Sequence, residues 1–110
     1  MTRVKFLADK QGIYGFDISG HCSVDGDDET GKTVCAAVSS AAYMAANTII
    51  EVIGCKYSVD IDEAHMRFTV KNHDSIAFAV LKGFKLHIEQ LAGQYDSNIK
   101  IYGGAEDVKD

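Results

Sequence analysis

The chain has 110 residues, a net charge of −5 and no proline, which suits one domain with a hydrophobic core and is too short for two. The negative charge argues against a general nucleic-acid-binding protein, although it allows binding of a basic peptide. No apolar run reaches the roughly 18 residues of a membrane span, and no secretory signal is recognised, so we expect a cytoplasmic protein without membrane contact.

The first elements that we predict are two strands joined as a hairpin. Residues 3–8 and 14–18 alternate apolar and polar side chains, which is typical of half-buried strands, and a turn at residues 9–12 connects them. Gly20 ends the second strand. The acidic loop that follows, residues 22–31, lacks the ligand spacing of an EF-hand, so we interpret it as a solvated loop and not as a calcium site.

A long helix is predicted from about Thr33 to Ile53, with Gly54 as its C-cap. Its apolar residues recur at helical spacing and should form one buried stripe. The stripe comprises Val34, Val38, Ala41, Ala42, Ala45, Ile49, Val52 and Ile53.

The second half of the chain repeats this order of elements. Residues 57–61 and 66–70 alternate as a second hairpin, and residues 99–101 form a last strand. Between them Asp74 can cap a second helix that ends at Gly93. The apolar stripe of this helix is Ala77, Val80, Leu81, Phe84, Ile88 and Leu91.

The predicted fold is therefore a two-layer α+β domain of order ββαββαβ over residues 1–104. Two helices pack on one face of a mostly antiparallel sheet. The other sheet face carries Arg, Lys, Asp and Thr, which suits solvent or a partner. We expect residues 105–110 to be a disordered C-terminal tail.

The segment Gly26–Thr33, GDDETGKT, satisfies the phosphate-loop pattern G-x-x-x-x-G-K-[ST]. Its context argues against nucleotide binding, because no buried strand runs straight into the first glycine. The variable positions are acidic and would stand beside phosphate charges. The chain also offers no βαβ series, so a nucleotide binder is the less favoured hypothesis.

A cysteine nucleophile is the stronger chemical hypothesis. Cys35 is predicted in the first turn of the long helix, where unpaired N–H groups and the helix dipole favour a thiolate. His21, at the end of the second strand, can take the thiol proton. The structural alternative is that Cys35 is a small buried hydrophobic residue, as many cysteines are.

The remaining cysteines and histidines offer no comparable pair. Cys22 adjoins His21 but lies in the loop without dipole support, and Cys55 is expected in a strand. Three histidines are expected at a hairpin, a helix entry and a helix surface, namely His65, His73 and His87. Three cysteines without a C-x-x-C motif predict no disulfide framework and no zinc ribbon, and we predict no metal or cofactor.

Gly20-His21, a glycine-containing loop, and then Val34-Cys35-Ala36-Ala37-Val38-Ser39 resemble the signature of the ribosomal-processing cysteine protease (Prp) family. The order of elements, the alanine-rich first helix and the size match as well, so the resemblance covers essentially the whole chain. It implies a cytoplasmic, homodimeric cysteine peptidase. Family members remove an N-terminal extension from large-subunit ribosomal protein twenty-seven.

The resemblance also implies roles for single residues. The family's nucleophile falls on Cys35 and its catalytic histidine on His21. The supporting serine falls on Ser39, and the glycine before the histidine falls on Gly20. In the thioester mechanism that we expect, the backbone N–H of Ala36 is a candidate oxyanion donor beside that of Cys35.

One position departs from the family pattern. Lys32 stands three residues before the cysteine, where members usually carry aspartate, and Asp28 or Glu29 could replace the missing carboxylate. The acidic loop is also longer than usual. The alternative hypothesis is therefore a ribosome-associated binding module that has lost catalysis.

Overall fold

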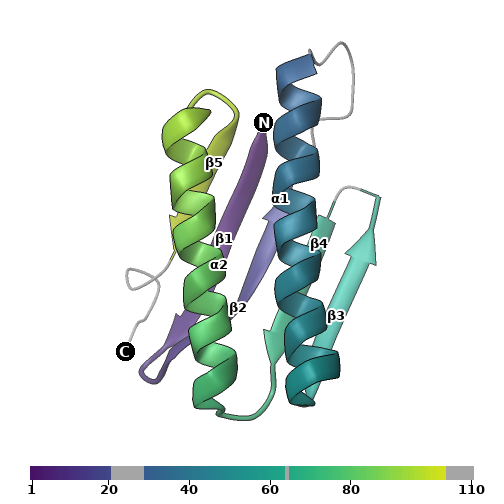
Figure 1. Cartoon of the computed structure of the whole chain (residues 1–110), viewed down its shortest axis with the longest axis vertical. Coiled ribbons are helices and arrows are strands. Elements are labelled where there is room, and N and C mark those ends of the chain that lie inside the picture. The colour runs from purple at the N-terminus through teal and green to yellow at the C-terminus, as the bar shows by residue number, and fades with distance from the viewer. Residues whose placement is uncertain (21–28, 64, 104–110) are drawn as a thin grey trace.

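The computed structural model describes residues 1–20, 29–63 and 65–103. Figure 1 shows two helices side by side over one face of a sheet. The element order confirms the predicted two-layer α+β fold. The elements are β1 (Thr2–Asp9), β2 (Gly12–Ser19), α1 (Glu29–Asn47), η1 (Thr48–Ile53), β3 (Tyr57–Asp62), β4 (His65–Val70), α2 (Ser75–Gln94) and β5 (Ile99–Gly103).

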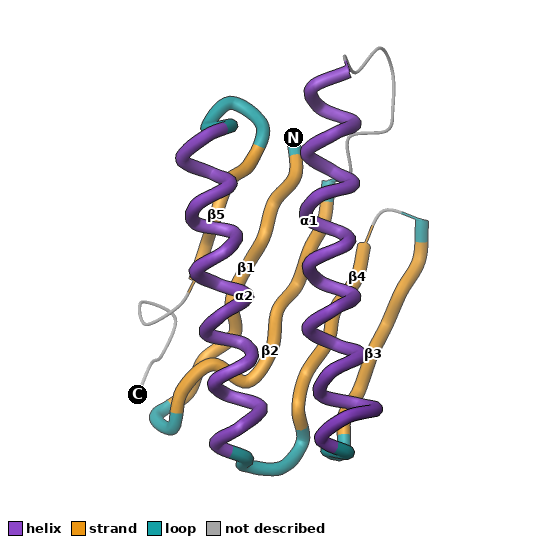
Figure 2. Tube along the Cα trace, in the orientation of Figure 1, coloured by secondary structure: helices purple, strands orange, loops and turns teal. Residues whose placement is uncertain are grey.

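The sheet has the strand order β3-β4-β2-β1-β5. Strands β1 and β2, β2 and β4, and β3 and β4 pair antiparallel, whereas β1 and β5 pair parallel. The chain reaches β5 only after α2 has carried it back along the sheet (Figure 2). The mostly antiparallel sheet is thus confirmed, and its two edges are β3 and β5.

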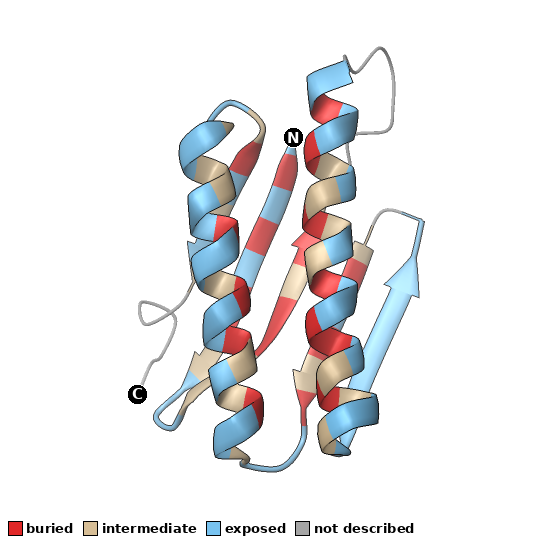
Figure 3. Cartoon of the chain, viewed as in Figure 1, coloured by how far each residue is buried: buried red, intermediate tan, exposed pale blue. Residues whose placement is uncertain are grey.

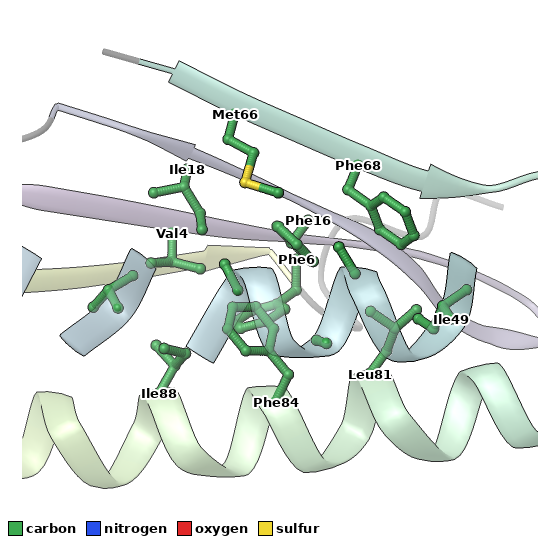
Figure 4. Close-up of a cluster of buried hydrophobic side chains, with 14 of the residues drawn as sticks. Val4, Phe6, Phe16, Ile18, Ile49, Met66, Phe68, Leu81, Phe84 and Ile88 are labelled. Atoms are coloured by element: carbon green, nitrogen blue, oxygen red, sulfur yellow. The ribbon is translucent and has the colours of Figure 1, made fainter. Parts of the chain in front are cut away.

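The hydrophobic core lies between the helices and the sheet (Figure 4). Phe84 of α2 is its centre, because its ring lies 4.7 Å from that of Phe16 and 5.7 Å from that of Phe6, measured between centroids. Aromatic pairs at such distances stabilise a core beyond the area that they bury. The predicted stripe of α2 is confirmed, since Ala77, Leu81, Phe84 and Ile88 are buried.

Asp74 begins α2 as predicted. Its carboxylate accepts hydrogen bonds of 2.9 Å from the backbone N–H groups of Ile76 and Ala77. These bonds satisfy two of the N–H groups that a helix start leaves without partners.

The first helix differs from prediction at both ends. It begins at Glu29, so the last residues of the expected loop are helical, and its final turn, η1, is a π-helix. Because a π-helical turn changes the angle between successive residues, Val52 leaves the predicted stripe and is 78% exposed. Gly54 ends η1 with a positive φ of 85° and confirms the predicted C-cap.

By length and composition the continuous helix Glu29–Ile53 could cross a membrane. Our expectation concerned an unbroken apolar run, and in this helix polar residues such as Ser39 and Ser40 interrupt the apolar ones. Here its buried residues belong to the core beneath the two helices. A core helix meets the same criteria because one of its faces is apolar.

Strand β3 is exposed along its whole length, although its alternation predicted a half-buried strand. Figure 3 shows β3 in the exposed colour beside α1. The reason is tertiary: β3 is an edge strand, and two helices do not cover all five strands. The prediction that Cys55 lies in a strand is also wrong, since this residue is buried in the segment between η1 and β3.

The predicted tail, residues 105–110, and most of the acidic loop lie outside the described residues, so the structure does not test these predictions.

Candidate active site

Cys35 is partly exposed and is the seventh residue of α1, in the second turn. The prediction that it lies in the first turn is therefore wrong, because the helix starts four residues earlier than its apolar stripe indicated. Only the first four N–H groups of a helix lack a partner within the helix, and the dipole effect fades after the first turn. Cys35 therefore lies beyond the part of the helix terminus on which the prediction relied.

The same shift affects the expected oxyanion donors. The backbone N–H groups of Cys35 and Ala36 lie inside α1, where N–H groups bond to the carbonyl four residues earlier. A role for Ala36 as oxyanion donor stays a prediction, and it requires the first turns of α1 to open when substrate binds.

Ser39 follows Cys35 by four residues, so the two side chains share one side of α1. Lys32 precedes Cys35 by three residues and is exposed, which places it on the same side, one turn earlier. Glu29 stands six residues before Cys35, a spacing that does not share a helix face, so it does not replace the missing carboxylate in this structure.

His21 lies outside the described residues, but the residue before it is described. Gly20 has a φ of 71°, a left-handed conformation that favours glycine. A Cβ built there would lie 2.7 Å from the carbonyl oxygen of Met1 and closer still to the guanidinium of Arg3. Gly20 therefore turns the chain one residue after β2 ends at Ser19.

Figure 1 shows the end of β2, the β3–β4 turn and the N-terminal half of α1 at one end of the molecule. The strand that leads to His21 and the helix that carries Cys35 thus meet in one region, as the nucleophile hypothesis requires.

Two of the described histidines, His65 and His73, contact other side chains. His65 Nε2 lies 2.7 Å from Asp17 Oδ1, and Arg67 Nη1 donates a 2.9 Å hydrogen bond to Asp17 Oδ2. These three side chains form a hydrogen-bonded cluster on the sheet face that the helices leave open. His73 packs edge-on against Phe78, with 6.1 Å between ring centroids.

Cys55 is a poor nucleophile for physical reasons. Burial raises the pKa of its thiol, and the charge of Asp74 and a hydrogen bond to that carboxylate raise it further. Its thiolate is therefore scarce near neutral pH, and the residue is only 8% exposed. Cys22 lies outside the described residues.

A small pocket lies on the Cys35 side of α1. It has a volume of about 150 Å³ and opens between α1 and the turn that joins β3 to β4. We call it the hairpin pocket. Its lining consists of Ile18, Ser39, Ala42, Tyr43, Ile61, Asp62, Glu63, His65 and Met66. Of these, sequence reasoning identified only Ser39, although the alternation of β3 signalled an apolar side for Ile61.

A larger hollow of about 700 Å³ lies on the other flank of α1, between α1 and α2. It is lined mainly by small and apolar side chains, and Cys35, Ser39 and Gly20 take no part in it. Size alone therefore does not mark the candidate site.

The structure argues against the phosphate-loop hypothesis. Gly31, Lys32 and Thr33 are helical, whereas a phosphate loop needs them in a loop and at a helix start. Strand β2 pairs antiparallel with both of its neighbours, so no parallel βαβ unit surrounds the segment. In residues 1–20, 29–63 and 65–103, no three His, Cys, Asp or Glu side chains are grouped so that they could hold a metal ion.

Comparisons with known proteins identify a family and similar folds. The sequence profile of the family described as cysteine protease Prp matches residues 1–100. No curated protein sequence matches the chain. A crystal structure of a Streptococcus mutans protein superimposes with a TM-score of 0.84 at 23% identity, covering 94% of this chain and 96% of that one.

Two further crystal structures are of an essential ribosomal processing protease Prp from S. aureus. One, in complex with a substrate peptide, has a TM-score of 0.85 at 16% identity. The other, with a covalently linked product peptide, has a TM-score of 0.80 at 17% identity. Each alignment covers 94% of this chain and 99% of the S. aureus chain.

Proposed function

This chain belongs to the Prp family of cysteine proteases, and from that premise we propose that it removes the N-terminal extension of large-subunit ribosomal protein twenty-seven. The chain is a cysteine peptidase, and we assign the nucleophile to Cys35 and the general base to His21. The S. aureus relatives support the substrate class, since they are ribosomal processing proteases crystallised with substrate and product peptides.

In the acylation step, Sγ of Cys35 attacks the carbonyl carbon of the scissile peptide bond. His21 takes the thiol proton, and the carbonyl oxygen becomes an oxyanion. When this tetrahedral intermediate collapses, the C–N bond breaks and His21 returns the proton to the leaving amine. The product is a thioester between Cys35 and the N-terminal fragment.

In the second step, water hydrolyses the thioester. His21 removes a proton from the water, hydroxide adds to the thioester carbonyl, and the C–S bond breaks. The proton returns to Cys35 and the carboxylate product leaves. No metal takes part in either step.

One observation carries the assignment. Cys35 is partly exposed on a side of α1 that continues through Ser39 into the hairpin pocket, whereas Cys55 is buried beside a carboxylate. Of the two cysteines in the described residues, only Cys35 lies one helical turn from a residue that lines this pocket, Ser39. Gly20 supports the assignment because its left-handed backbone matches the need for a glycine at the position before the family's catalytic histidine.

The test incubates the purified protein with a peptide that spans the extension junction and follows the products by mass. We expect cleavage by wild type and none by Cys35→Ala, which should still bind the peptide. Cys35→Ser should be nearly inactive, because a hydroxyl ionises far less readily than a thiol. His21→Ala should lower turnover by about 10²-fold or more. An uncut peptide with wild type, bound as tightly as by Cys35→Ala, contradicts the proposal.

That same outcome would favour the alternative, a ribosome-associated binding module. Its motivation is Lys32, where the family usually has aspartate. The two functions differ in the thiol as well, since a binding module has no need for a reactive Cys35.

We further infer that the protein acts as a homodimer in the cytoplasm. The family resemblance supports both points. Analytical ultracentrifugation at micromolar concentration tests the dimer, and a single species with the 11.9 kDa mass of one chain would contradict it.

A further inference from the structure

Strand β3 carries an apolar side that nothing in the described structure covers. Tyr57, Val59 and Ile61 lie opposite Val70, Phe68 and Met66 of β4, so they face the helix layer. Their partners on β4 are buried, yet all three β3 residues are exposed, and Ile61 is 53% exposed. An edge strand with an exposed apolar side is suited to contact with another chain.

The hairpin pocket opens at the Ile61 end of this strand. Its apolar lining includes Ile18 and Met66, which are buried core residues. Tyr43 of α1, 45% exposed, and Ile61 of β3 are its most exposed apolar lining residues. A volume of about 150 Å³ accommodates roughly one apolar side chain, since liquid water occupies about 30 Å³ per molecule.

The position of the pocket relative to Cys35 limits what can fill it. Ser39 lines the pocket, and it lies about 6 Å from Cys35 along the helix axis at 1.5 Å per residue. An extended peptide covers about 3.3 Å per residue. A peptide whose carbonyl meets Cys35 and which runs along α1 therefore brings a side chain about two residues from the scissile bond to this pocket.

The charged residues of the pocket lining limit which substrate side chains can bind there. Asp62 and Glu63, at the end of β3 and in the turn after it, line the pocket and carry negative charge. They disfavour an acidic substrate side chain there and favour basic neighbours.

We propose that the hairpin pocket is the subsite that receives one aliphatic or aromatic substrate side chain, about two residues from the scissile bond. The peptide lies extended between α1 and β3, with a basic residue near Glu63. This inference rests on the proposed function, because it takes Cys35 as the nucleophile.

The test measures coupling between the pocket and single substrate positions. In a Cys35→Ala background, Tyr43→Ala and Ile61→Ala should each weaken the binding of the junction peptide about fivefold, because each removes apolar contact area. With active enzyme the same changes should raise KM and leave kcat within about twofold. Both residues are exposed, so the folded state should survive, and the melting temperature checks this.

Matched controls come from exposed apolar residues outside the pocket. Met44, next to Tyr43 on α1 and 72% exposed, lines the groove toward α2. Ile76, an exposed isoleucine on α2, matches Ile61. Met44→Ala and Ile76→Ala should leave peptide binding and KM unchanged. An equal loss with these controls overturns the assignment of the pocket.

A double-mutant cycle identifies the occupant. Replacing the pocket-filling residue of the peptide by alanine should weaken binding to the parent protein, with little further loss when Ile61 is already alanine. If the loss of binding from Ile61→Ala adds to the loss from alanine at every apolar peptide position, the subsite proposal is wrong. If coupling appears but wild type cuts no peptide, the proposed function fails and the binding pocket stands. If wild type cleaves the peptide but no coupling appears, the subsite proposal fails and the proposed function stands.

Discussion

At the residue scale, the environments of two cysteines predict different reactivity. Cys35 is partly exposed on α1, whereas Cys55 is buried with Asp74 beside it. Alkylation requires the thiolate, so a raised pKa and burial both slow the reaction of Cys55.

We therefore predict that iodoacetamide modifies Cys35 at least about tenfold faster than Cys55 at pH 7.5. The rate at Cys55 should rise only above the usual thiol pKa of 9.0, because its own pKa is raised. Peptide mapping by mass spectrometry separates these sites from Cys22. His21→Ala should slow modification of Cys35 and leave Cys55 unaffected. Faster labelling of Cys55 contradicts the prediction.

Gly20 supports a second prediction at this scale. Gly20→Ala forces a Cβ into a left-handed backbone position against Met1 and Arg3, which should destabilise the fold by about 1–2 kcal/mol. Because His21 is the next residue, kcat/KM on the junction peptide should also fall. Urea denaturation and peptide kinetics measure the two effects.

The control for this change is Gly93→Ala on α2, where nothing lies within 4 Å of an added Cβ. It should stabilise the protein by about 0.5–1 kcal/mol, because alanine is the better helix former. If Gly20→Ala and Gly93→Ala change the stability equally, the argument from the left-handed backbone of Gly20 is wrong.

At the element scale, capping and edge position explain most of the architecture. Asp74 starts α2 and Gly54 ends η1, and both were readable in the sequence. The exposure of β3 could not be predicted from the sequence, since it depends on which strands the helices cover.

Asp74 can be tested through its two hydrogen bonds. Asp74→Ala should lower the free energy of unfolding by about 1 kcal/mol, within a range of about 0.5–2, because two N–H groups lose their acceptor. Asp74→Asn keeps an N-cap acceptor and should cost much less. Without the carboxylate charge, Cys55 should titrate at lower pH in both variants. A loss with asparagine as large as with alanine contradicts the capping role.

The start of α1 supports a further element-scale prediction. Because Gly31–Thr33 are helical, ATP or GTP at millimolar concentration should not raise the melting temperature, and Lys32→Ala should behave like wild type. Differential scanning fluorimetry measures this. A saturable increase that Lys32→Ala abolishes would restore the nucleotide hypothesis.

At the scale of the whole molecule, stability depends on one core between two helices and one face of the sheet. Leu81 is fully buried in that core, whereas Leu86 on the same helix is exposed. The two leucines therefore form a matched pair for testing how much burial in this core contributes to the free energy of unfolding.

Leu81→Ala should destabilise the protein by about 2–5 kcal/mol, since it leaves a cavity in the packed core. Leu86→Ala should change stability by less than about 0.5 kcal/mol. Urea denaturation with both variants measures the difference. Similar losses would show that the α2 surface is buried in solution, for example against a second copy of the chain.

Local patterns in the sequence predict the order and type of the elements, and with them the Cys35–His21 hypothesis. Helix and strand periods, the Asp74 cap and the Gly54 stop are local signals, because they depend on residues a few positions apart. The GH…VCAAVS motif is local in the same sense. These features were therefore predictable without coordinates.

Features that depend on residues far apart in the sequence were not predictable in this way. Strand order places β5 beside β1 and leaves β3 at an edge, so the apolar side of β3 is exposed although its alternation predicted burial. The start of α1 at Glu29 moved Cys35 into the second turn. The hairpin pocket joins residues of β2, α1, β3 and β4, from Ile18 to Met66. Such contacts arise from long-range packing, which no local period encodes.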